Sequence, residues 1–329
     1  MAEYCIGIDL GGTFIKFGLL DRSNKVSGIF QLPTPNDKGP EPVIQQMIAG
    51  GKRLLADNKL GVKDVLGAGI GSPGPLDFVN GIVRDLPNIP GFQNVPLRDR
   101  IAKGIGVPAE LENDANAAGL GEYLAGAGKG YGDIVLLTLG TGVGSGIIVD
   151  GKILHGWHGT GAELGHIIVQ PGGELCACGQ RGCLERYSSA TNMARYAMRL
   201  IQEGRESSLR ETLGRQGSID ARDIELAAKA GDKLAAEVWD RSLYYLAVGC
   251  VDICRTFDPD AIVLSGGLAK AGEQLLGPLR DHFRKLHWTI MDIMTRIVIA
   301  TLGNDAGVIG AAGVAWQKFG GQKAAAAIK

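Results

Sequence analysis

The sequence predicts an α/β protein that contains two similar domains. Short β-rich runs alternate with stretches in which apolar residues recur at helical spacing. The 329 residues correspond to about two domains of about 150 residues each. In addition, a strand, a glycine turn and a second strand occur near the start of the chain and again in its middle.

Predicted strands dominate the first half of the chain. We expect strands at residues 4–10, 13–20, 25–32 and 65–70 and a helix over about 41–58. The repeat consists of strands at 133–139 and 143–149, followed by an Asp150-Gly151 hairpin turn. Asp9 aligns with Thr138, and Asp21 aligns with Asp150, at the same offset of 129 residues. This offset favours two copies of one domain that face each other across a cleft; the alternative is chance, because glycine-turned hairpins are common.

The second half of the chain is more helical. Before it, in the first half, a short strand at 107–110 leads into a helical run that starts at Asp114. Further helices are expected at 184–203, 219–230, 233–257, 269–286 and about 305–319. An apolar strand at 261–264 ends in Ser265-Gly266-Gly267, and a low-complexity tail occupies 324–329.

Composition excludes several classes of protein. The chain has 34 Lys and Arg against 35 Asp and Glu, and this balance argues against broad binding to nucleic acid or to membrane surfaces. Its first residues lack a signal-peptide pattern, and it has no apolar run of membrane-spanning length. Three of its six cysteines fall within eight residues, which fits metal binding in a reducing compartment. We therefore expect a cytoplasmic protein.

Glycine turns after three strands suggest a phosphate site. The 51 glycines are about twice the average usage. A glycine after a strand lets backbone N–H groups face an anion, and a nearby carboxylate such as Asp9 suits Mg²⁺ held together with phosphate oxygens. Lys16 would neutralise phosphate or face solvent. The candidate nucleotide residues are Asp9, Gly11, Gly12, Thr13, Lys16, Gly140, Thr141, Gly142, Gly266 and Gly267.

Two other phosphate motifs fail. Gly128-Lys129 is followed by Gly130, so the chain has no Walker A lysine motif there. The Gly69-x-Gly71-x-x-Gly74 segment contains Pro73 where a dinucleotide-binding helix would begin. A nicotinamide cofactor is therefore not expected.

Asp114 is the candidate catalytic residue. It stands at the junction of a strand and a helix, where α/β proteins often place their chemistry, and it would act there as a general base. The alternative is an N-cap, a position that Asp favours. Asn113 would bind a polyol or cap a turn.

The most specific local pattern is a set of zinc-ligand types. His166, Cys176, Cys178 and Cys183 match a tetrahedral zinc site with four protein ligands. Such a filled site would be structural and would hold in place a loop that carries Glu163 and Glu185. The alternative is a group of free thiols.

Taken together, five motifs resemble the ROK family of sugar kinases and repressors, and within it the bacterial glucokinases. The motifs are Asp-Leu-Gly-Gly-Thr at 9–13, Glu-Asn-Asp-Ala-Asn-Ala-Ala at 112–118, Leu-Gly-Thr-Gly-Val-Gly-Ser-Gly at 139–146, Glu-Leu-Gly-His at 163–166 and Cys-x-Cys-Gly-x-x-Gly-Cys-Leu-Glu at 176–185. The sequence departs from the family pattern at Phe14 and Phe92.

The resemblance implies an actin-like ATPase (ribonuclease H-like) fold, with two similar lobes around a cleft and a zinc-pinned loop. Residues 1–115 with about 305–329 would form the N-terminal lobe, and 116–304 the C-terminal lobe. The implied activity is phosphorylation of glucose at its 6-hydroxyl by ATP with Mg²⁺, with Asp114 as the base. The implied sugar ligands are Gly74, Asn88, Asn113, Asp114, Glu163, His166 and Glu185.

Alternatives remain within and outside the kinases. Within the kinases, the alternative acceptors to glucose are N-acetylmannosamine, N-acetylglucosamine, fructose and allose. A repressor would carry a DNA-reading module before the first glycine turn, whereas only eight residues precede Asp9. A non-catalytic sugar sensor would be expected to lack Asp114 or the phosphate turns. The resemblance also implies a homodimer or homotetramer.

Overall fold

The computed structural model describes residues 2–321, and the predicted low-complexity tail lies outside them. The chain divides into two compact units. Unit 1 comprises Met1–Ile134, Gly146–Ala162 and Thr301–Lys329, and unit 2 comprises Val135–Ser145 and Glu163–Ala300. The lobe boundaries expected from the sequence stay a prediction.

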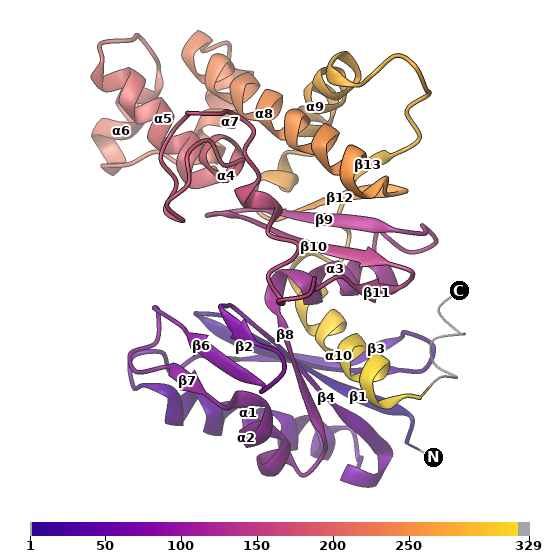
Figure 1. Cartoon of the computed structure of the whole chain (residues 1–329). Coiled ribbons are helices and arrows are strands. Elements are labelled where there is room, and N and C mark those ends of the chain that lie inside the picture. Colours follow the sequence, from indigo (N-terminus) through magenta and orange to yellow (C-terminus); the bar gives the residue numbers. More distant parts are fainter. Residues whose placement is uncertain (1, 322–329) are drawn as a thin grey trace. The chain divides into compact units, whose positions relative to one another are not determined.

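Unit 1 is built on a five-stranded sheet with the order β3-β2-β1-β4-β8 (Figure 1). Strands β1 and β2 pair antiparallel, whereas β4 runs parallel to both β1 and β8. Its strands are β1 (Tyr4–Leu10), β2 (Phe14–Asp21), β3 (Val26–Pro33), β4 (Val65–Ser72) and β8 (Ala109–Asn113). A smaller sheet contains β5 (Leu76–Asp77), β6 (Ile82–Asp85) and β7 (Gln93–Val95).

Helices cover both faces of the unit 1 sheet. On one face, Ile6, Ile8 and Phe17 form a fully buried core with apolar residues of α1 (Pro40–Asp57) and α2 (Leu97–Ile105). On the other face lies α10 (Ala306–Phe319), which also packs against α3 (Asp114–Ala125). Both faces of the sheet need a cover because successive side chains of a strand point to opposite faces.

Glycines allow α10 to approach its neighbours at backbone distance. A Cβ atom placed on Gly7 of β1 would lie 2.0 Å from the carbonyl oxygen of Val308, and one on Gly69 of β4 would lie 1.7 Å from that of Ala311. A Cβ on Gly310 of α10 itself would lie 1.6 Å from the carbonyl oxygen of Ala117 in α3. Because backbone atoms cannot swing aside, a larger residue at these positions would have to displace α10 or its neighbour.

The second sheet repeats the strand order of the first, as β11-β10-β9-β12-β13. Its strands are β9 (Ile134–Leu139), β10 (Val143–Val149), β11 (Lys152–Ile153), β12 (Ala261–Ser265) and β13 (Arg296–Ile299). Its last two strands are parallel, as are their counterparts β4 and β8. The repeat predicted from the glycine-turned hairpins is therefore confirmed over five strands.

In unit 2, α8 (Lys233–Phe257) is the helix against which most of the others pack. It contacts α4 (Glu185–Ser188), α5 (Ala190–Gln202), α7 (Ala221–Lys229) and α9 (Glu273–Leu286), and α6 (Leu209–Gln216) contacts α7. Two expected helices are interrupted. Ser189 is extended and caps α5 with its hydroxyl, which ends α4, and Gly272 has a positive φ of 58° that separates Leu268–Ala271 from α9.

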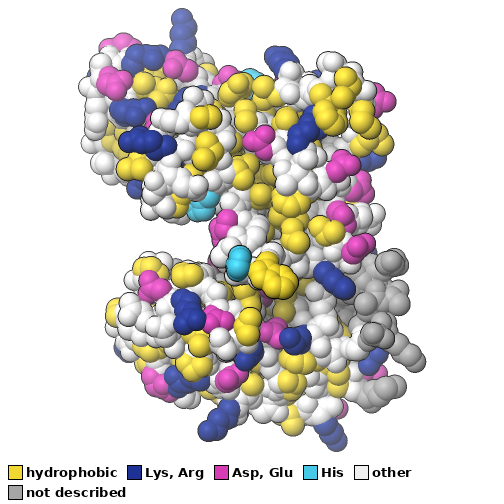
Figure 2. All heavy atoms as spheres, viewed as in Figure 1, with side chains coloured by type: hydrophobic (Ala, Val, Ile, Leu, Met, Phe, Trp, Pro, Cys, Tyr) yellow, Lys and Arg dark blue, Asp and Glu magenta, His cyan; other side chains and the backbone are white. Residues whose placement is uncertain are grey.

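The surface agrees with the balanced charge. On the face drawn in Figure 2, Lys and Arg side chains are interspersed with Asp and Glu side chains. Among residues 2–321, no helix combines the length and apolar character needed to cross a bilayer.

The contact between α10 and β4 can be tested with Gly69→Ala. The added methyl group would overlap the Ala311 carbonyl, so we expect the free energy of unfolding in urea to fall by about 3 kcal/mol. Gly214→Ala is the matched control, because Gly214 is exposed in α6 with no atom within 4 Å of the new Cβ. It should stabilise the protein by about 0.5–1 kcal/mol. Equal stability of G69A and wild type would contradict the close approach.

Candidate functional site

The first glycine turn of unit 1 is held through its carbonyl groups. The Thr34 hydroxyl donates to the Gly11 carbonyl at 2.7 Å, and the Asn36 amide donates to the Gly12 carbonyl at 2.8 Å. Gly12 and Thr13 themselves are exposed. With its carbonyls held by these hydrogen bonds, the turn leaves the backbone of Gly12 and Thr13 accessible.

Asp9 lies next to this turn, in a space that two glycines leave open. A Cβ on Gly307, at the start of α10, would lie 2.6 Å from one Asp9 carboxylate oxygen, and a Cβ on Gly71 of β4 would lie 3.5 Å from the other. Burial, followed by the charge of Asp114, raises the pKa of Asp9 to about 7. The opposing charge of Lys16, its cross-strand partner, lowers this pKa in part. Asp9 and Asp114 are thus neighbouring, partly buried carboxylates.

Lys16 is engaged within the protein. Its ammonium group pairs with Asp305 at 3.0 Å and donates to the Asn304 carbonyl at 2.7 Å. Both partners precede α10, so this pair joins the β1–β2 hairpin to the segment that carries Gly307. Contact between Lys16 and a phosphate stays a prediction.

Asp114 begins α3 directly after β8, but it is not the N-cap. That position belongs to Asn113, whose side-chain oxygen accepts from the backbone N–H groups of Ala115 and Asn116. Burial raises the pKa of Asp114, while a backbone hydrogen bond from Ala115 lowers it. The helix therefore does not need Asp114 as its cap, and a carboxylate with a raised pKa is suited to accept a proton near neutral pH.

The other sugar candidates of unit 1 lie on loops beside this junction. A Cβ on Gly74 would lie 3.8 Å from the side-chain nitrogen of Asn113, so these two candidates are neighbours. Asn88 is exposed on a loop closed by three backbone hydrogen bonds, in which Leu86 donates to Phe92, Ile89 to Leu86 and Phe92 to Ile89. Phe92 is fully buried, so this departure from the family pattern is a core residue that supports the loop.

In unit 2, the second glycine turn contacts a predicted sugar ligand. The Glu185 carboxylate accepts from the backbone N–H of Val143 at 3.0 Å, and a Cβ on Gly142 would lie 2.4 Å from the same oxygen. The third turn adjoins the second, since Gly266 has a φ of 89° and a Cβ there would lie 2.5 Å from the Leu139 carbonyl. Unit 2 therefore brings both of its glycine turns and Glu185 into one region.

The Glu163–His166 turn packs directly on β10. A Cβ on Gly165 would lie 2.0 Å from the Val143 carbonyl oxygen, and the Ser145 hydroxyl accepts from the Leu164 N–H at 2.9 Å. Glu163 is exposed and His166 is partly buried. The close approach fixes the turn that carries both residues.

The predicted metal ligands converge. The ligand atoms of His166, Cys176, Cys178 and Cys183 all lie within 4.8 Å of one another. His166 Nδ1 is 3.7 Å from Cys176 Sγ, and the sulfurs of Cys178 and Cys183 are 3.6 Å apart. A tetrahedral zinc ion with Zn–S bonds of about 2.3 Å has sulfur–sulfur edges of about 3.8 Å. The four residues therefore fit such an ion through Nδ1 of His166, which leaves Nε2 for another partner.

Several supporting residues were not predicted from the sequence. Glu174, in the hairpin that carries the cysteines, pairs with Arg186 and Arg199 at 3.1 Å and so ties the hairpin to α4 and α5. Gly307 provides space for Asp9, and the buried Glu112 carboxylate lies 2.7 Å from Nε2 of the partly exposed His155. Each of these contacts joins residues far apart in the chain, so local patterns did not indicate them.

Asp9→Asn tests whether burial raises the pKa of the Asp9 carboxylate. The pKa of Asp9 is raised from 3.8 to about 7, so the folded state binds more protons between these values and loses stability as the pH rises toward 7. Asparagine lacks this loss. We expect D9N to melt at a higher temperature than wild type at about pH 8, and the gain to shrink at about pH 5.

The exposed substitution Asp99→Asn on α2 is the control and should give no such pH-dependent gain. A D9N melting temperature at or below that of wild type at the higher pH would show that Asp9 is not held in an unfavourable environment.

Known proteins resemble the chain over nearly its whole length. A profile of the ROK family matches residues 5–318. A glucokinase of Thermotoga maritima is 40% identical over 96% of this chain and 98% of its own length, and one of Halalkalibacterium halodurans is 38% identical over 94% and 93%.

Solved structures agree. A ROK hexokinase from Thermus thermophilus superposes with a TM-score of 0.82 at 34% identity, covering 96% of this chain and 98% of that chain. A ROK glucokinase from Streptomyces griseus in complex with glucose and AMPPNP gives 0.75 at 36% identity, covering 95% and 99%. The two sheets of repeated strand order confirm the actin-like ATPase fold expected from the sequence. The chain belongs to the ROK family.

Proposed function

We propose that this ROK protein is a glucokinase, which transfers the γ-phosphoryl group of ATP to the 6-hydroxyl of D-glucose. The observation that carries the proposal is Asp114, a carboxylate of raised pKa at the start of α3 that the helix does not use as its cap. Glucokinases with 38% and 40% identity over nearly the full chain support the choice of substrate.

ATP with Mg²⁺ would use the glycine turns. The exposed Gly12–Thr13 backbone and the turn at Gly140–Gly142 offer N–H groups to phosphate oxygens, and Gly266-Gly267 would lie nearer the nucleoside. Asp9 would hold the hydrated Mg²⁺, and a nearby cation would favour its ionised form despite burial. Lys16 balances the charge beside Asp9.

The sugar would be held by groups that suit its hydroxyls. Carboxylates accept several hydrogen bonds, which fits Asp114, Glu163 and Glu185, and amides such as Asn113 both donate and accept. Asn88, Gly74 and His166 complete the proposed set. The contact between Glu185 and the second turn couples this sugar ligand to the proposed phosphate site.

The chemistry then requires one proton transfer and one phosphoryl transfer. The Asp114 carboxylate accepts the proton of the sugar 6-hydroxyl. At the same time, the oxygen of this hydroxyl forms a bond to the γ-phosphorus of ATP. The bond from this phosphorus to the bridging oxygen breaks, and ADP leaves with that electron pair. Catalysis is mainly positioning and stabilisation of charge, as is general for phosphoryl transfer.

Zinc would have a structural role at His166, Cys176, Cys178 and Cys183. When bound there, it supplies four-coordinate cross-linking and no open position for chemistry. Ligation at Nδ1 fixes the direction of His166 Nε2, which would then donate to a sugar hydroxyl. A homodimer or homotetramer and a cytoplasmic location stay predictions.

A coupled assay of ADP release over hexoses and N-acetylhexosamines tests the proposal. Glucose should give the highest kcat/KM. Preference for N-acetylmannosamine, N-acetylglucosamine, fructose or allose would correct the acceptor, and absence of turnover with every sugar would favour a non-catalytic sugar sensor.

Asp114→Asn removes the base while preserving size. We expect kcat with glucose to fall at least about 100-fold, the usual contribution of a general base, while the melting temperature is not lowered. Asp99→Asn, exposed on α2, should keep the wild-type kcat. Turnover of D114N close to that of wild type would remove Asp114 from the role of base.

Cys178→Ala removes one of four proposed zinc ligands. Bound zinc should fall from about one ion per chain, and KM for glucose should rise about tenfold through loss of one oriented hydrogen bond. The control Cys250→Ala, in the buried core of α8, should retain zinc. A C178A protein that lacks zinc and keeps the wild-type KM would contradict the pinning role.

A further inference from the structure

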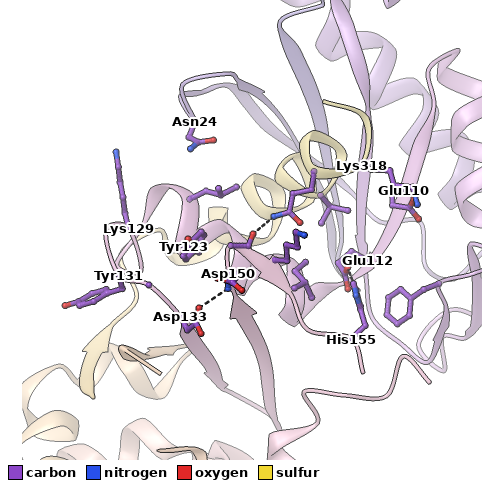
Figure 3. Close-up of a pocket in the computed structure, with 18 of the residues that line it drawn as sticks. Asn24, Glu110, Glu112, Tyr123, Lys129, Tyr131, Asp133, Asp150, His155 and Lys318 are labelled. Carbon is purple, nitrogen blue, oxygen red and sulfur yellow. Dashed lines mark hydrogen bonds and ion pairs between the residues drawn. The ribbon is translucent and has the colours of Figure 1, made fainter. Parts of the chain in front are cut away.

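Glu112 is a buried carboxylate whose two oxygens are both hydrogen-bonded. Its side chain is 3% exposed. One oxygen accepts from the Asn113 backbone N–H at 2.8 Å and from the Asn116 side-chain amide at 2.9 Å. The other faces the His155 ring nitrogen Nε2 at 2.7 Å, at the side of a cavity of about 1030 Å³ within unit 1 (Figure 3). Burying a carboxylate oxygen without a hydrogen-bond donor is costly. His155 supplies the partner for the Glu112 oxygen that Asn113 and Asn116 do not contact.

The contacts of Glu112 bracket Asp114. Asn113 immediately precedes it, and Asn116 lies two residues after it in the first turn of α3. Asn113 in turn caps the helix through its side-chain oxygen. The position of the Glu112 carboxylate therefore determines how Asn113 and Asp114 are presented.

His155 also fixes the loop that leads to Glu163. Its carbonyl accepts from the Gly161 N–H at 2.8 Å, which closes the loop between them. Its ring packs on Phe78 with centroids 4.9 Å apart, and a Cβ on Gly159 would lie 2.9 Å from the Phe78 ring. One residue thus contacts the junction through its side chain and the loop through its backbone.

We propose that His155 is a positioning residue for phosphoryl transfer. Its hydrogen bond to Glu112 holds Asn113 and Asp114 in a fixed position relative to the loop that precedes Glu163. The inference rests on the proposed kinase function. His155 has no direct part in the reaction and acts through Glu112.

His155→Phe and His155→Gln separate the hydrogen bond from packing. Phenylalanine keeps a ring against Phe78 and loses the donor, whereas the glutamine amide reaches the former position of Nε2. For H155F we expect kcat with glucose to fall about 10- to 100-fold and KM for glucose to rise, with KM for ATP within about twofold of wild type. H155Q should recover most of the loss, and His158→Phe, exposed on the same loop, should behave as wild type.

A merely structural role would give a different result. Partial unfolding lowers the active fraction, and hence kcat, without changing KM for glucose. Wild-type kcat and KM in H155F, or an H155Q variant as impaired as H155F, would overturn the proposal. Should H155F fail to fold, His155→Asn replaces it, because its shorter amide does not reach Glu112.

Hydrogen exchange gives a readout independent of activity. Amides of residues 111–117 should exchange faster in H155F than in wild type, H155Q or H158F, because Asn113 N–H loses a fixed acceptor. Unchanged exchange in H155F would overturn the inference. If the wild-type protein phosphorylates no sugar, the proposed function fails, and the exchange result still decides whether the His155–Glu112 hydrogen bond holds residues 111–117 in place.

Discussion

Two neighbouring carboxylates, Asp9 and Asp114, are held partly buried in unit 1, and the electrostatic cost of this arrangement constrains the packing around them. Each lies at the end of a strand, and both have raised pKa values because of burial. Such groups destabilise a fold when ionised, so an otherwise apolar sheet with helices on both faces must offset them. Carboxylates with raised pKa values are candidates for chemistry, and both have a role in the proposed function.

Close packing of backbone on backbone gives this region its shape. Glycines in β1 and β4 let α10 lie against the sheet, and Gly307 at the start of α10 leaves room for the Asp9 carboxylate. The same device recurs in unit 2, where Gly142 leaves room for Glu185 and Gly165 brings the Glu163–His166 turn onto β10. The high glycine content thus reflects close approaches both at helix packing contacts and at turns.

Much of the fold followed from local patterns. The strands of both hairpins and the whole of α8 agree with expectation, because alternation and helical periodicity are strong there. The small sheet of β5, β6 and β7 was not predicted, since its strands are two to four residues long. The break at Ser189 shows why helix boundaries are harder to predict than helices. The Ser189 hydroxyl caps α5, although the helical spacing of apolar residues continues through this position.

The site was predictable to the extent that its residues form motifs. The convergence of His166 with the three cysteines followed from ligand types and spacing. The place of Asp114 at the start of α3 followed from the strand-to-helix pattern, and its role as a base stays a prediction. Asn113 rather than Asp114 is the N-cap of α3 because of the backbone conformation of a single turn, and the sequence pattern does not determine that conformation. Contacts of Asp9 with Gly307, of Glu112 with His155 and of Glu174 with Arg199 join distant segments and required the structure.

The central claim concerns the acceptor hydroxyl and one carboxylate. A crystal structure of the protein with glucose and a non-hydrolysable ATP analogue measures their separation directly. The account predicts an Asp114 carboxylate oxygen within about 2.6–3.2 Å of the sugar 6-hydroxyl, which in turn faces the terminal phosphate. A bound sugar with Asp114 turned away, or with a different side chain at that hydroxyl, would contradict it.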